Sequence, residues 1–463
     1  MQTLTHNGRV AIIGGGISGL SAAWALQQAG VDYTLLEASD RLGGKVLTER
    51  AGDFVIEAGP DAFLTQKPGA INLARELGLD LIPINQRPHA TYVLHHGKPI
   101  PLPDGVALIV PTKFVPFLRS PLLSLPGKLR MLLDLVLPGS GDASDETLAN
   151  FVTRRLGSEA LDKLAAPLMA GIYNGEAEQQ SLLATFPRYR ETEKQYGSII
   201  HGTIQQRKAQ KSSGAPAFMT PRDGTQALIE ALVARLSGDV RTKAMVQAIK
   251  GQENGAYWIR LENGERIEAD AVLITTPAPI AADLIRPFAA DAADLLASIR
   301  YLSSGTISLA YRVEDVKRPI DGFGVVIPPS EKRPINAITI TSEKFDQRAP
   351  ADHVLLRVFF GGSRSPATMA LSDDDLLALV RSELKAILGI EAAPLLHRIY
   401  RWWNANPQYD LGHLERIAAL EAALPEGIYL TGSAYRGVGL PDCIQQAQQN
   451  AQKIIHKLRV AHP

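Results

Sequence analysis

The first 40 residues alternate short apolar runs with a helical pattern. Residues 10–13 and 33–36 are short, mainly apolar runs, residues 21–28 between them have the composition of a helix, and Gly30 follows as its stop. Short apolar runs joined by a helix are typical of buried parallel strands and their crossover connection. The chain is therefore predicted to open with a β-α-β unit.

Similar patterns return twice later in the chain. Residues 225–236 predict a helix, and residues 271–276 predict a buried strand that Pro277 ends. Residues 428–430 predict another strand, followed by a glycine-rich turn and a helix. We expect these pieces to form one discontinuous cofactor-binding domain made of residues 1–85, 206–280 and 396–463.

The stretch from 86 to 205 is expected to be a helical insertion. Prolines at 111, 116, 121, 126 and 138 should divide it into short helices. Basic residues such as Lys113 and Arg119 alternate with large apolar ones such as Phe114 and Phe117. Two interpretations stay open: a surface that touches a membrane or admits an apolar substrate, or amphipathic core helices with solvated basic faces.

A second insertion, residues 281–395, is expected to form a substrate-binding sheet. Apolar runs at 305–311, 323–327, 337–340 and 354–360 predict antiparallel strands. Helices around 286–300 and 373–388 are expected to cap them. A sheet of this kind commonly walls one side of a substrate pocket.

The turn after the first strand carries a dinucleotide-binding pattern. Gly14, Gly16 and Gly19 have the G-x-G-x-x-G spacing, in which the glycines permit a tight turn, close approach of a pyrophosphate and close helix packing. Glu37 ends the second strand, where a carboxylate can accept hydrogen bonds from a ribose. Strand, helix, second strand and acid together predict a dinucleotide site.

A second glycine pair favours FAD over NAD(P). Arg41, Gly43 and Gly44 give the R-x-G-G pattern that follows the second strand in flavoproteins of the amine-oxidase type. The bend at Gly59 and Pro60 is expected to pass beside an isoalloxazine ring.

Composition narrows the function further. The 463 residues are 45% hydrophobic and 21% charged, with a net charge of zero, so there is no electrostatic argument for a nucleic-acid partner. Cys443 is the single cysteine, which excludes an internal disulfide, and the scattered histidines predict no metal site. The polar residues before residue 10 do not resemble a signal peptide, and no apolar stretch reaches the roughly 18 residues of a spanning helix. We expect a cytoplasmic protein.

Seven segments resemble the protoporphyrinogen and coproporphyrinogen III oxidase family, in its soluble bacterial branch. They are GGGISGL at 14–20, RLGGKV at 41–46, EAGPDAFL at 57–64, PLMAGIYNGE at 167–176, LLATFPRY at 182–189, RWWNANPQY at 401–409 and GVGLPDCI at 437–444. The resemblance implies an α/β fold, α+β overall: a Rossmann-like FAD-binding domain with an inserted mixed-sheet substrate domain and an inserted helical domain, as in p-hydroxybenzoate hydroxylase and amine oxidases.

The resemblance also assigns roles to individual residues. FAD contacts are expected at Gly14, Gly15, Gly16, Ile17, Ser18, Gly19, Glu37, Ala38, Gly44, Lys45, Gly59, Pro60, Asp61, Ala62, Val246, Trp403, Ala434, Val438, Gly439 and Leu440. Substrate contacts are expected at Lys67, Gly171 and Asn174. Plant and animal members carry arginine where this chain has Asp61, so the loop expected near the flavin differs from theirs at this position.

The implied reaction is the oxidation of a porphyrinogen to a porphyrin in haem biosynthesis, with six electrons passing to dioxygen. Bacterial resemblance favours coproporphyrinogen III over protoporphyrinogen IX. The flavin N5 does the chemistry, and no catalytic base is named because no histidine or carboxylate pair falls in a family motif. Lys67, Lys113, Arg188 and Arg222 are candidate partners for propionates, although a solvated surface role is the stronger interpretation for each.

Other partners and functions remain open. A ferrochelatase is a possible downstream partner, and contact with a membrane is expected to be peripheral at most. An FAD amine oxidase or carotenoid desaturase on the same scaffold is the distant alternative, and a flavin-binding protein without turnover is another. Trp402 and Trp403 are expected near the flavin or at the edge of the core, and Cys443 as a packed side chain.

Overall fold

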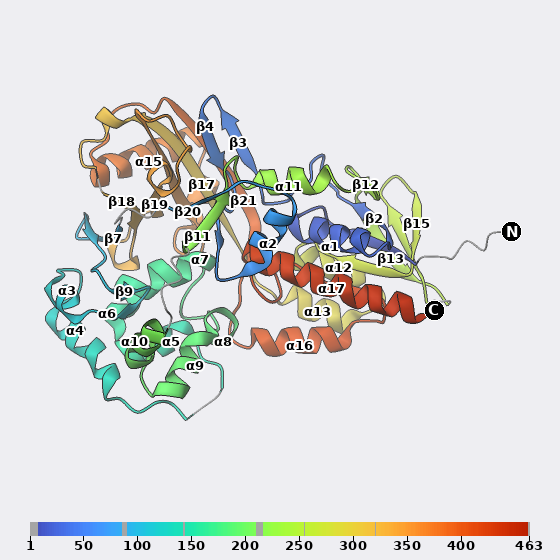
Figure 1. Ribbon diagram of the computed structural model, residues 1–463, viewed down its shortest axis with the longest axis horizontal. Coiled ribbons are helices and arrows are strands. Elements are labelled where there is room, and N and C mark those ends of the chain that lie inside the picture. Colours follow the sequence, from blue (N-terminus) through green and yellow to red (C-terminus); the bar gives the residue numbers. More distant parts are fainter. Residues whose placement is uncertain are drawn as a thin grey trace.

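A computed structural model describes residues 8–85, 90–141, 144–209, 216–253, 255–319 and 321–461. A five-stranded parallel sheet forms one half of the molecule, at the right of Figure 1, and a seven-stranded sheet and a group of helices form the other. The polar residues 1–7 before β1 and the start of the expected insertion, residues 86–89, lie outside the described residues.

The parallel sheet confirms the predicted β-α-β unit. Its strand order is β12-β2-β1-β16-β22. Helix α1 (Ile17–Gln28) crosses from β1 to β2. Such a crossover is right-handed in almost all proteins, and it leaves the carboxyl ends of the strands free for a ligand. The strands are β1 (Arg9–Ile13), β2 (Asp32–Leu36), β12 (Asp239–Arg241), β16 (Ala271–Ile274) and β22 (Ile428–Leu430).

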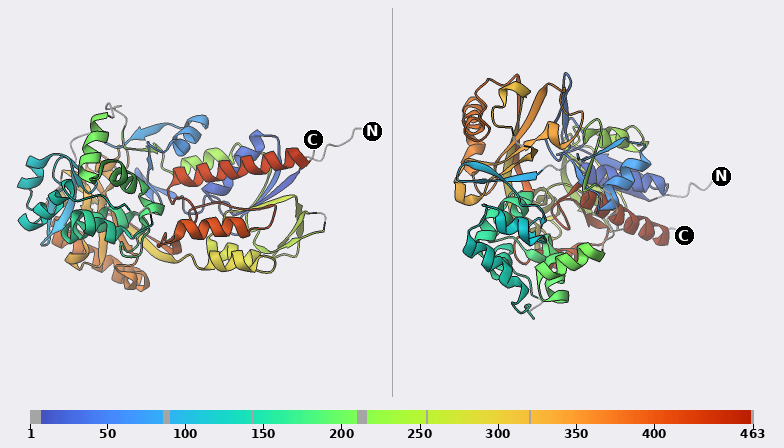
Figure 2. Two further views of the ribbon diagram at one scale, coloured as in Figure 1. Left: turned by 90° about the horizontal axis from the view of Figure 1, so that it is seen from below. Right: turned by 60° about the vertical axis from the view of Figure 1, so that its left-hand side comes forward.

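Two apolar cores enclose this sheet. On one face, Leu20 and Ala23 of α1 pack with Ile444 and Ala447 of the long helix α17 (Leu440–Ala461), which runs the length of this half in Figure 2. The same core includes α2 (Pro68–Glu76) and α11 (Gln226–Val233). The other face is covered by an antiparallel meander and three helices: β13 (Val246–Gly251), β14 (Tyr257–Leu261), β15 (Arg266–Ala269), α12 (Ala278–Ile285), α13 (Ala290–Ala297) and α16 (His413–Ala423).

The seven-stranded sheet has the order β21-β17-β20-β19-β18-β7-β8. Helix α15 (Asp373–Leu388) packs on it through Leu376, Val380 and Leu384, as expected for the segment 373–388. The helix expected around 286–300 lies elsewhere, because α13 joins the core beside the meander. The strands are β7 (Ala90–His95), β8 (Lys98–Pro101), β17 (Tyr301–Arg312), β18 (Gly322–Val326), β19 (Ile335–Ile340), β20 (His353–Gly361) and β21 (Leu396–Pro407).

Two segments pair with strands outside the domain to which the sequence assigned them, so the expected domain boundaries at 86 and 396 are wrong. Strands β7 and β8 were placed in the helical insertion, but β7 pairs with β18 in parallel. Strand β21 was placed in the cofactor-binding domain, but it pairs with β17 along most of its length. Both segments therefore belong to the substrate-side sheet, which is mixed, as the family resemblance implied.

Short helices follow from residue 114, as the prolines predicted, at the lower left of Figure 1. A buried ion pair fixes their arrangement: Arg155 and Asp134 lie 2.5 Å apart, and Asp134 also accepts hydrogen bonds from Ser198 and Ile200. The elements are α3 (Phe114–Arg119), α4 (Leu125–Leu132), α5 (Leu148–Leu156), α6 (Ser158–Ala160), a π-helix (Leu161–Ala170), α7 (Gly171–Tyr173), α8 (Leu182–Thr185), α9 (Pro187–Tyr196) and α10 (Ile199–Ala209), after the ribbon β9 (Val106–Ala107) and β10 (Val110–Pro111).

Small sheets join the two halves. Strand β11 (Phe218–Pro221) lies between β5 (Phe63–Leu64) and β6 (Leu81–Pro83), and β3 (Thr48–Ala51) pairs with β4 (Phe54–Glu57). These connections place the loop at residues 58–62 between the parallel sheet and the seven-stranded sheet. No described helix is long and apolar enough to span a membrane.

Candidate functional site

A cavity of about 850 Å³ opens at the carboxyl ends of β1, β2 and β16. It extends from the turn after β1 to the face of the seven-stranded sheet, where Thr306 and Phe359 line it. Ligands of open parallel sheets bind in the crevice outside the carboxyl ends of the strands. This cavity is therefore the expected cofactor and substrate site.

The three glycines of the turn after β1 differ in backbone conformation and surroundings. Gly14 has a φ of 111°, which favours glycine. A Cβ on Gly19 would lie 2.0 Å from the carbonyl oxygen of Gly14, so only glycine lets α1 approach the turn this closely. A Cβ on Gly16 would meet nothing within 4 Å, because Gly16 faces the cavity. Gly16 is also the N-cap of α1, without a side-chain cap, so the first N–H groups of the helix are available to an anion.

Glu37 is held in a fixed orientation at the end of β2. Its Oε2 accepts a hydrogen bond from the N–H of Gly15 at 2.7 Å, and its Oε1 accepts one from Ser39 at 2.8 Å. Its carbonyl oxygen accepts from Ala244 at 2.9 Å, which brings the segment leading to Val246 to the same end of the cavity. The carboxylate and Val246 thus line the same end of the cavity, which agrees with the arrangement expected for a nucleoside.

The second glycine pair packs against the first. The N–H of Gly43 donates to the carbonyl oxygen of Gly15 at 2.8 Å, and a Cβ on Gly44 would lie 3.3 Å from Cα of Gly16. Lys45 follows, and its Nζ donates to the carbonyl oxygen of Ala405 at 2.6 Å. Burial among the cavity walls lowers the pKa of Lys45, and Cys443 opposes this shift.

Tyr409 organises the glycine-rich turn before α17. Its hydroxyl donates to the carbonyl oxygen of Ser433 at 2.9 Å and accepts from the N–H of Gly437 at 2.7 Å. The ring stacks on His413, with 4.0 Å between centroids. The hydroxyl thereby fixes both ends of the turn that carries Ala434 and Val438 into the cavity.

The opposite wall comes from the seven-stranded sheet. Its cavity-facing residues are Ser304 and Thr306 of β17, Arg357 and Phe359 of β20, and Trp402 of β21. The indole Nε1 of Trp402 donates to the carbonyl oxygen of Ala58 at 2.9 Å, which joins this wall to the loop at residues 58–62. Sequence reasoning missed Ser304, Thr306, Arg357 and Phe359; the one signal was the charge of Arg357 inside an otherwise apolar run.

Most residues named from the sequence line this cavity. They are Gly14, Gly16, Ile17, Ser18, Glu37, Ala38, Gly44, Lys45, Gly59, Pro60, Ala62, Val246, Trp403, Ala434, Val438, Gly439 and Leu440 on the cofactor side, with Asn174 on the substrate side. Gly15 and Gly19 lie behind the wall and support it.

The other named residues do not line it. Asp61 forms an ion pair with Lys344 at 2.6 Å, and Lys67 forms one with Asp442 at 2.7 Å. Burial raises the Asp61 pKa, but Lys344, Arg357 and Arg348 outweigh it and lower the pKa overall. Gly171 is exposed at the start of α7.

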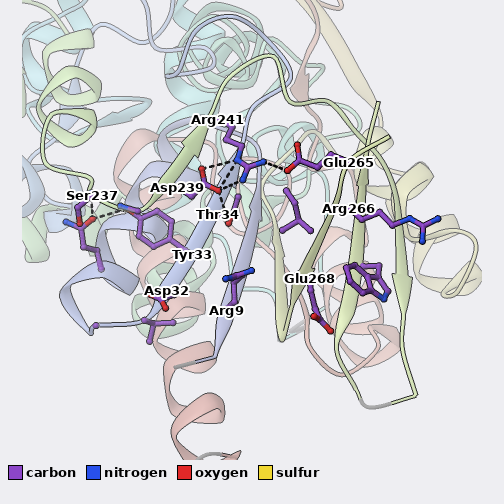
Figure 3. A pocket seen from close by; sticks show the side chains of 16 residues that line it. Arg9, Asp32, Tyr33, Thr34, Ser237, Asp239, Arg241, Glu265, Arg266 and Glu268 are labelled. Atoms are coloured by element: carbon purple, nitrogen blue, oxygen red, sulfur yellow. Dashed lines mark hydrogen bonds and ion pairs between the residues drawn. The ribbon is translucent and has the colours of Figure 1, made fainter. Parts of the chain in front are cut away.

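A second hollow lies at the opposite, amino-terminal edge of the parallel sheet (Figure 3). Its charged residues largely neutralise one another: Arg241 contacts Asp239 at 2.7 Å and Glu265 at 2.6 Å. This hollow lies away from the glycine-rich turn after β1 and shares no lining residue with the cavity at the carboxyl ends of the strands. Among the described residues, no group of three or more histidine, cysteine, aspartate or glutamate side chains is placed to hold a metal ion.

Comparison with known proteins identifies the scaffold. A family model described as flavin containing amine oxidoreductase matches residues 17–455. The chain belongs to this family. The match runs from the start of α1 through both inserted regions to most of α17, so it covers all of the cavity lining except residues 13–16 of the first strand and turn.

Full-length relatives are found among enzymes and solved structures. The chain is 34% identical to the coproporphyrinogen III oxidase of Bacillus subtilis, covering 95% of this chain and 96% of that one. It is 32% identical to the chloroplastic protoporphyrinogen oxidase of rice, covering 96% and 87%. A protein of Exiguobacterium sp. 255-15, provisionally named protoporphyrinogen oxidase, superposes with a TM-score of 0.86 at 32% identity, covering 97% and 99%.

The cofactor of this flavoprotein is FAD, and the residues present fit it. The uncapped start of α1 and the open space at Gly16 suit a pyrophosphate, while the fixed carboxylate of Glu37 suits a ribose. From there the cavity continues past Lys45 and the 58–62 loop to the sheet, with room for a ring system and a substrate.

Proposed function

We propose that this protein is an FAD-dependent oxidase that converts a porphyrinogen to a porphyrin in haem biosynthesis, with coproporphyrinogen III as the favoured substrate. The observation that carries the proposal is similarity over almost the whole chain to bacterial enzymes named coproporphyrinogen III oxidase, at 34% identity for Bacillus subtilis and 32% for Staphylococcus aureus. The cavity supports it, because one continuous space joins the dinucleotide end to a wide sheet face.

The reaction removes six hydrogens from the macrocycle in three two-electron oxidations. Bound FAD would supply the hydride acceptor. Dioxygen would be the final electron acceptor and would be reduced to hydrogen peroxide. In each oxidation a meso carbon–hydrogen bond breaks with its electron pair, one proton is released and a new double bond forms. Over the three oxidations two of the protons leave pyrrole nitrogens and the third leaves a meso carbon by tautomerisation, so that four meso C–H and two N–H hydrogens are lost in total. The protein must bind the macrocycle, orient it and limit access of water.

The cavity walls suit that role. Phe359 and Trp402 offer broad apolar surface to a macrocycle, and Asn174, held in a left-handed conformation at φ 55°, narrows the space from the helical side. Glu37 is the only carboxylate among the lining residues, and it lies at the dinucleotide end. The proposal therefore needs no protein carboxylate to accept the pyrrole protons, which pass to solvent.

Protoporphyrinogen IX is the alternative substrate. It is favoured by the 32% identity to the rice chloroplastic enzyme, whose name specifies that substrate. An amine oxidase or carotenoid desaturase is a more distant alternative on the same scaffold.

Peripheral contact with an anionic membrane is part of the proposal. Val115 and Leu118 of α3, Leu125 and Leu129 of α4, and Val136 are exposed apolar side chains of the same helical region. Arg119 lies on α3, so apolar and basic groups lie close together, as in interfacial helices. Sedimentation with anionic vesicles tests this: we expect the protein to bind them, and the double variant Leu125→Glu with Leu129→Glu to stay in solution. Equal sedimentation of both would contradict membrane contact.

The wider setting follows from the chemistry. The product is a metal-free porphyrin, so the next partner is a ferrochelatase that inserts iron, and we place both steps in the cytoplasm.

The reaction itself is tested by measuring its stoichiometry in an oxygen electrode with peroxide detection. Three dioxygen molecules consumed and three peroxides formed per porphyrin support the proposal, whereas porphyrin formation without enzyme-dependent oxygen uptake contradicts it.

A further inference from the structure

A cluster of charged residues lies between the 58–62 loop and the seven-stranded sheet. Asp61 pairs with Lys344, and Glu57 accepts hydrogen bonds from Thr48 and Thr225. Arg348 and Arg357 complete the cluster, since both contribute to the electrostatic environment of Asp61. Three cations thus face two carboxylates. Burial raises the pKa of Glu57, and the hydrogen bonds from Thr48 and Thr225 oppose this shift.

Arg357 is the member of this cluster that faces the cavity. It is 5% exposed and lines the cavity wall. Its Nη2 donates to the carbonyl oxygens of Ala58 at 3.2 Å and Gly59 at 2.6 Å, while Nε is buried without an acceptor. Within the described part of the chain no carboxylate lies within ion-pair distance of it. A buried guanidinium with unused donors is costly unless a ligand supplies the acceptor.

Thr306 provides a second unused group on the same wall. It lies opposite Phe359 in the pairing of β17 with β20, and Arg357 is two residues from Phe359, so the three side chains share one face of the sheet. Thr306 is 5% exposed and lines the cavity, and its hydroxyl has no hydrogen-bond partner. The unpartnered Thr306 hydroxyl and the unpartnered Nε of Arg357 therefore belong to diagonal neighbours on the same face of β17 and β20.

We propose that Arg357 and Thr306 form a carboxylate-binding subsite that takes one propionate of the tetrapyrrole. This deepens the proposed function and rests on it. A propionate would accept hydrogen bonds from the guanidinium and the threonine hydroxyl and would neutralise the excess charge of the cluster. Arg357 is already fixed by the carbonyls of Ala58 and Gly59, so it is preorganised to orient the macrocycle relative to the cofactor loop.

The test compares two porphyrins with the same macrocycle: coproporphyrin III, whose four propionates are charged, and its tetramethyl ester, in which they are neutral methyl esters. Binding to the FAD-loaded protein is followed by porphyrin fluorescence anisotropy. Arg357→Met is expected to weaken binding of the acid by roughly tenfold to a hundredfold and binding of the ester by less than about threefold. Arg348→Lys is the matched control. It alters a buried arginine of the same cluster that does not line the cavity, and it should keep the preference for the acid.

Thr306→Val keeps the test valid if Arg357→Met folds poorly. It removes an unpaired buried hydroxyl at nearly constant volume, so the melting temperature should stay equal or rise, while binding of the acid should weaken by about threefold to tenfold. Thr431→Val is its control, because Thr431 is also fully buried with an unpartnered hydroxyl but does not line the cavity.

The outcomes separate the two proposals. Normal turnover with equal loss of acid and ester binding in both variants overturns the subsite alone. Loss of FAD from Thr306→Val, with the preference for the acid unchanged, also overturns it and assigns these groups to the cofactor. A wild-type protein that oxidises no porphyrinogen overturns the proposed function and the subsite together.

Discussion

Lys67 and Asp442 form an ion pair in which Nζ lies 2.8 and 2.7 Å from the two carboxylate oxygens. Lys67 precedes α2, and Asp442 lies in the first turn of α17, so the pair joins the segment after the cofactor loop to the helix that follows the glycine-rich turn. Lys67 was expected from the sequence to contact the substrate. In the structure its charge is balanced within the protein.

Replacing Lys67 tests which role it has. Because the ion pair is partly exposed, Lys67→Met should lower the free energy of unfolding by about 1 kcal/mol or less. It should also change KM equally for coproporphyrinogen III and protoporphyrinogen IX. Asp442→Asn, which breaks the same pair from the other side, should give the same pattern. A larger KM increase for the four-propionate substrate in Lys67→Met alone would show that Lys67 binds a propionate.

Gly16→Val should yield a folded protein without flavin. The new side chain meets no protein atom within 4 Å of its Cβ, so the fold tolerates it, but it enters the space where the pyrophosphate binds. Flavin absorbance after gel filtration and circular dichroism measure the two effects. Gly141→Val is the control, since Gly141 is exposed and its Cβ also meets no neighbour. A yellow, fully loaded Gly16→Val protein would rule out this position for the pyrophosphate.

Stability should fall in mildly acidic solution because of His413. Burial lowers its pKa from 6.5 to about 4, and its Nε2 donates to the carbonyl oxygen of Tyr435. The folded state thus binds fewer protons than the unfolded state between these values, so stability is complete above about pH 6.5 and is lost as pH falls toward 4, by about 3 kcal/mol in total.

Denaturant unfolding from pH 7.5 to pH 4.5 measures this loss. His413→Gln keeps a donor for Tyr435 but does not titrate in this range, so its unfolding free energy should depend less steeply on pH. Parallel curves for the two proteins would contradict the assignment.

Cys443 should be unreactive in the folded protein. Burial raises its pKa to about 11, and Lys45 opposes the shift, so at pH 8 only about a thousandth of the thiol is ionised. A thiol-specific chromogenic reagent should label the native holoenzyme slowly and the denatured chain at one equivalent, because Cys443 is the only cysteine. Rapid labelling of the native protein would show that the glycine-rich turn before α17 opens and exposes Cys443.

The cofactor half was predictable because its signals are local. Gly14, Gly16 and Gly19 each need a specific backbone freedom within one turn, and Glu37 follows at a fixed distance along a short helix and strand. Residues 10 to 37 therefore determine their own arrangement, and the structure places the acid and the turn as predicted.

The substrate half depends on pairing between distant segments. Residues 90–101 were assigned to a helical insertion, because nothing local shows that β7 pairs with β18 more than 200 residues away. Arg357 was missed for the same reason. Its neighbours in sequence are apolar, and only the pairing of β20 with β17 and the position of the 58–62 loop show that its guanidinium meets the cavity.

Porphyrin fluorescence during aerobic turnover, with coproporphyrinogen III and protoporphyrinogen IX compared at equal concentration, tests the central claim most directly. We expect enzyme-dependent fluorescence from both, with a kcat/KM for coproporphyrinogen III roughly tenfold or more above that for protoporphyrinogen IX. Fluorescence no faster than the enzyme-free control with either substrate, in protein that carries a full complement of FAD, would contradict the assignment as a porphyrinogen oxidase.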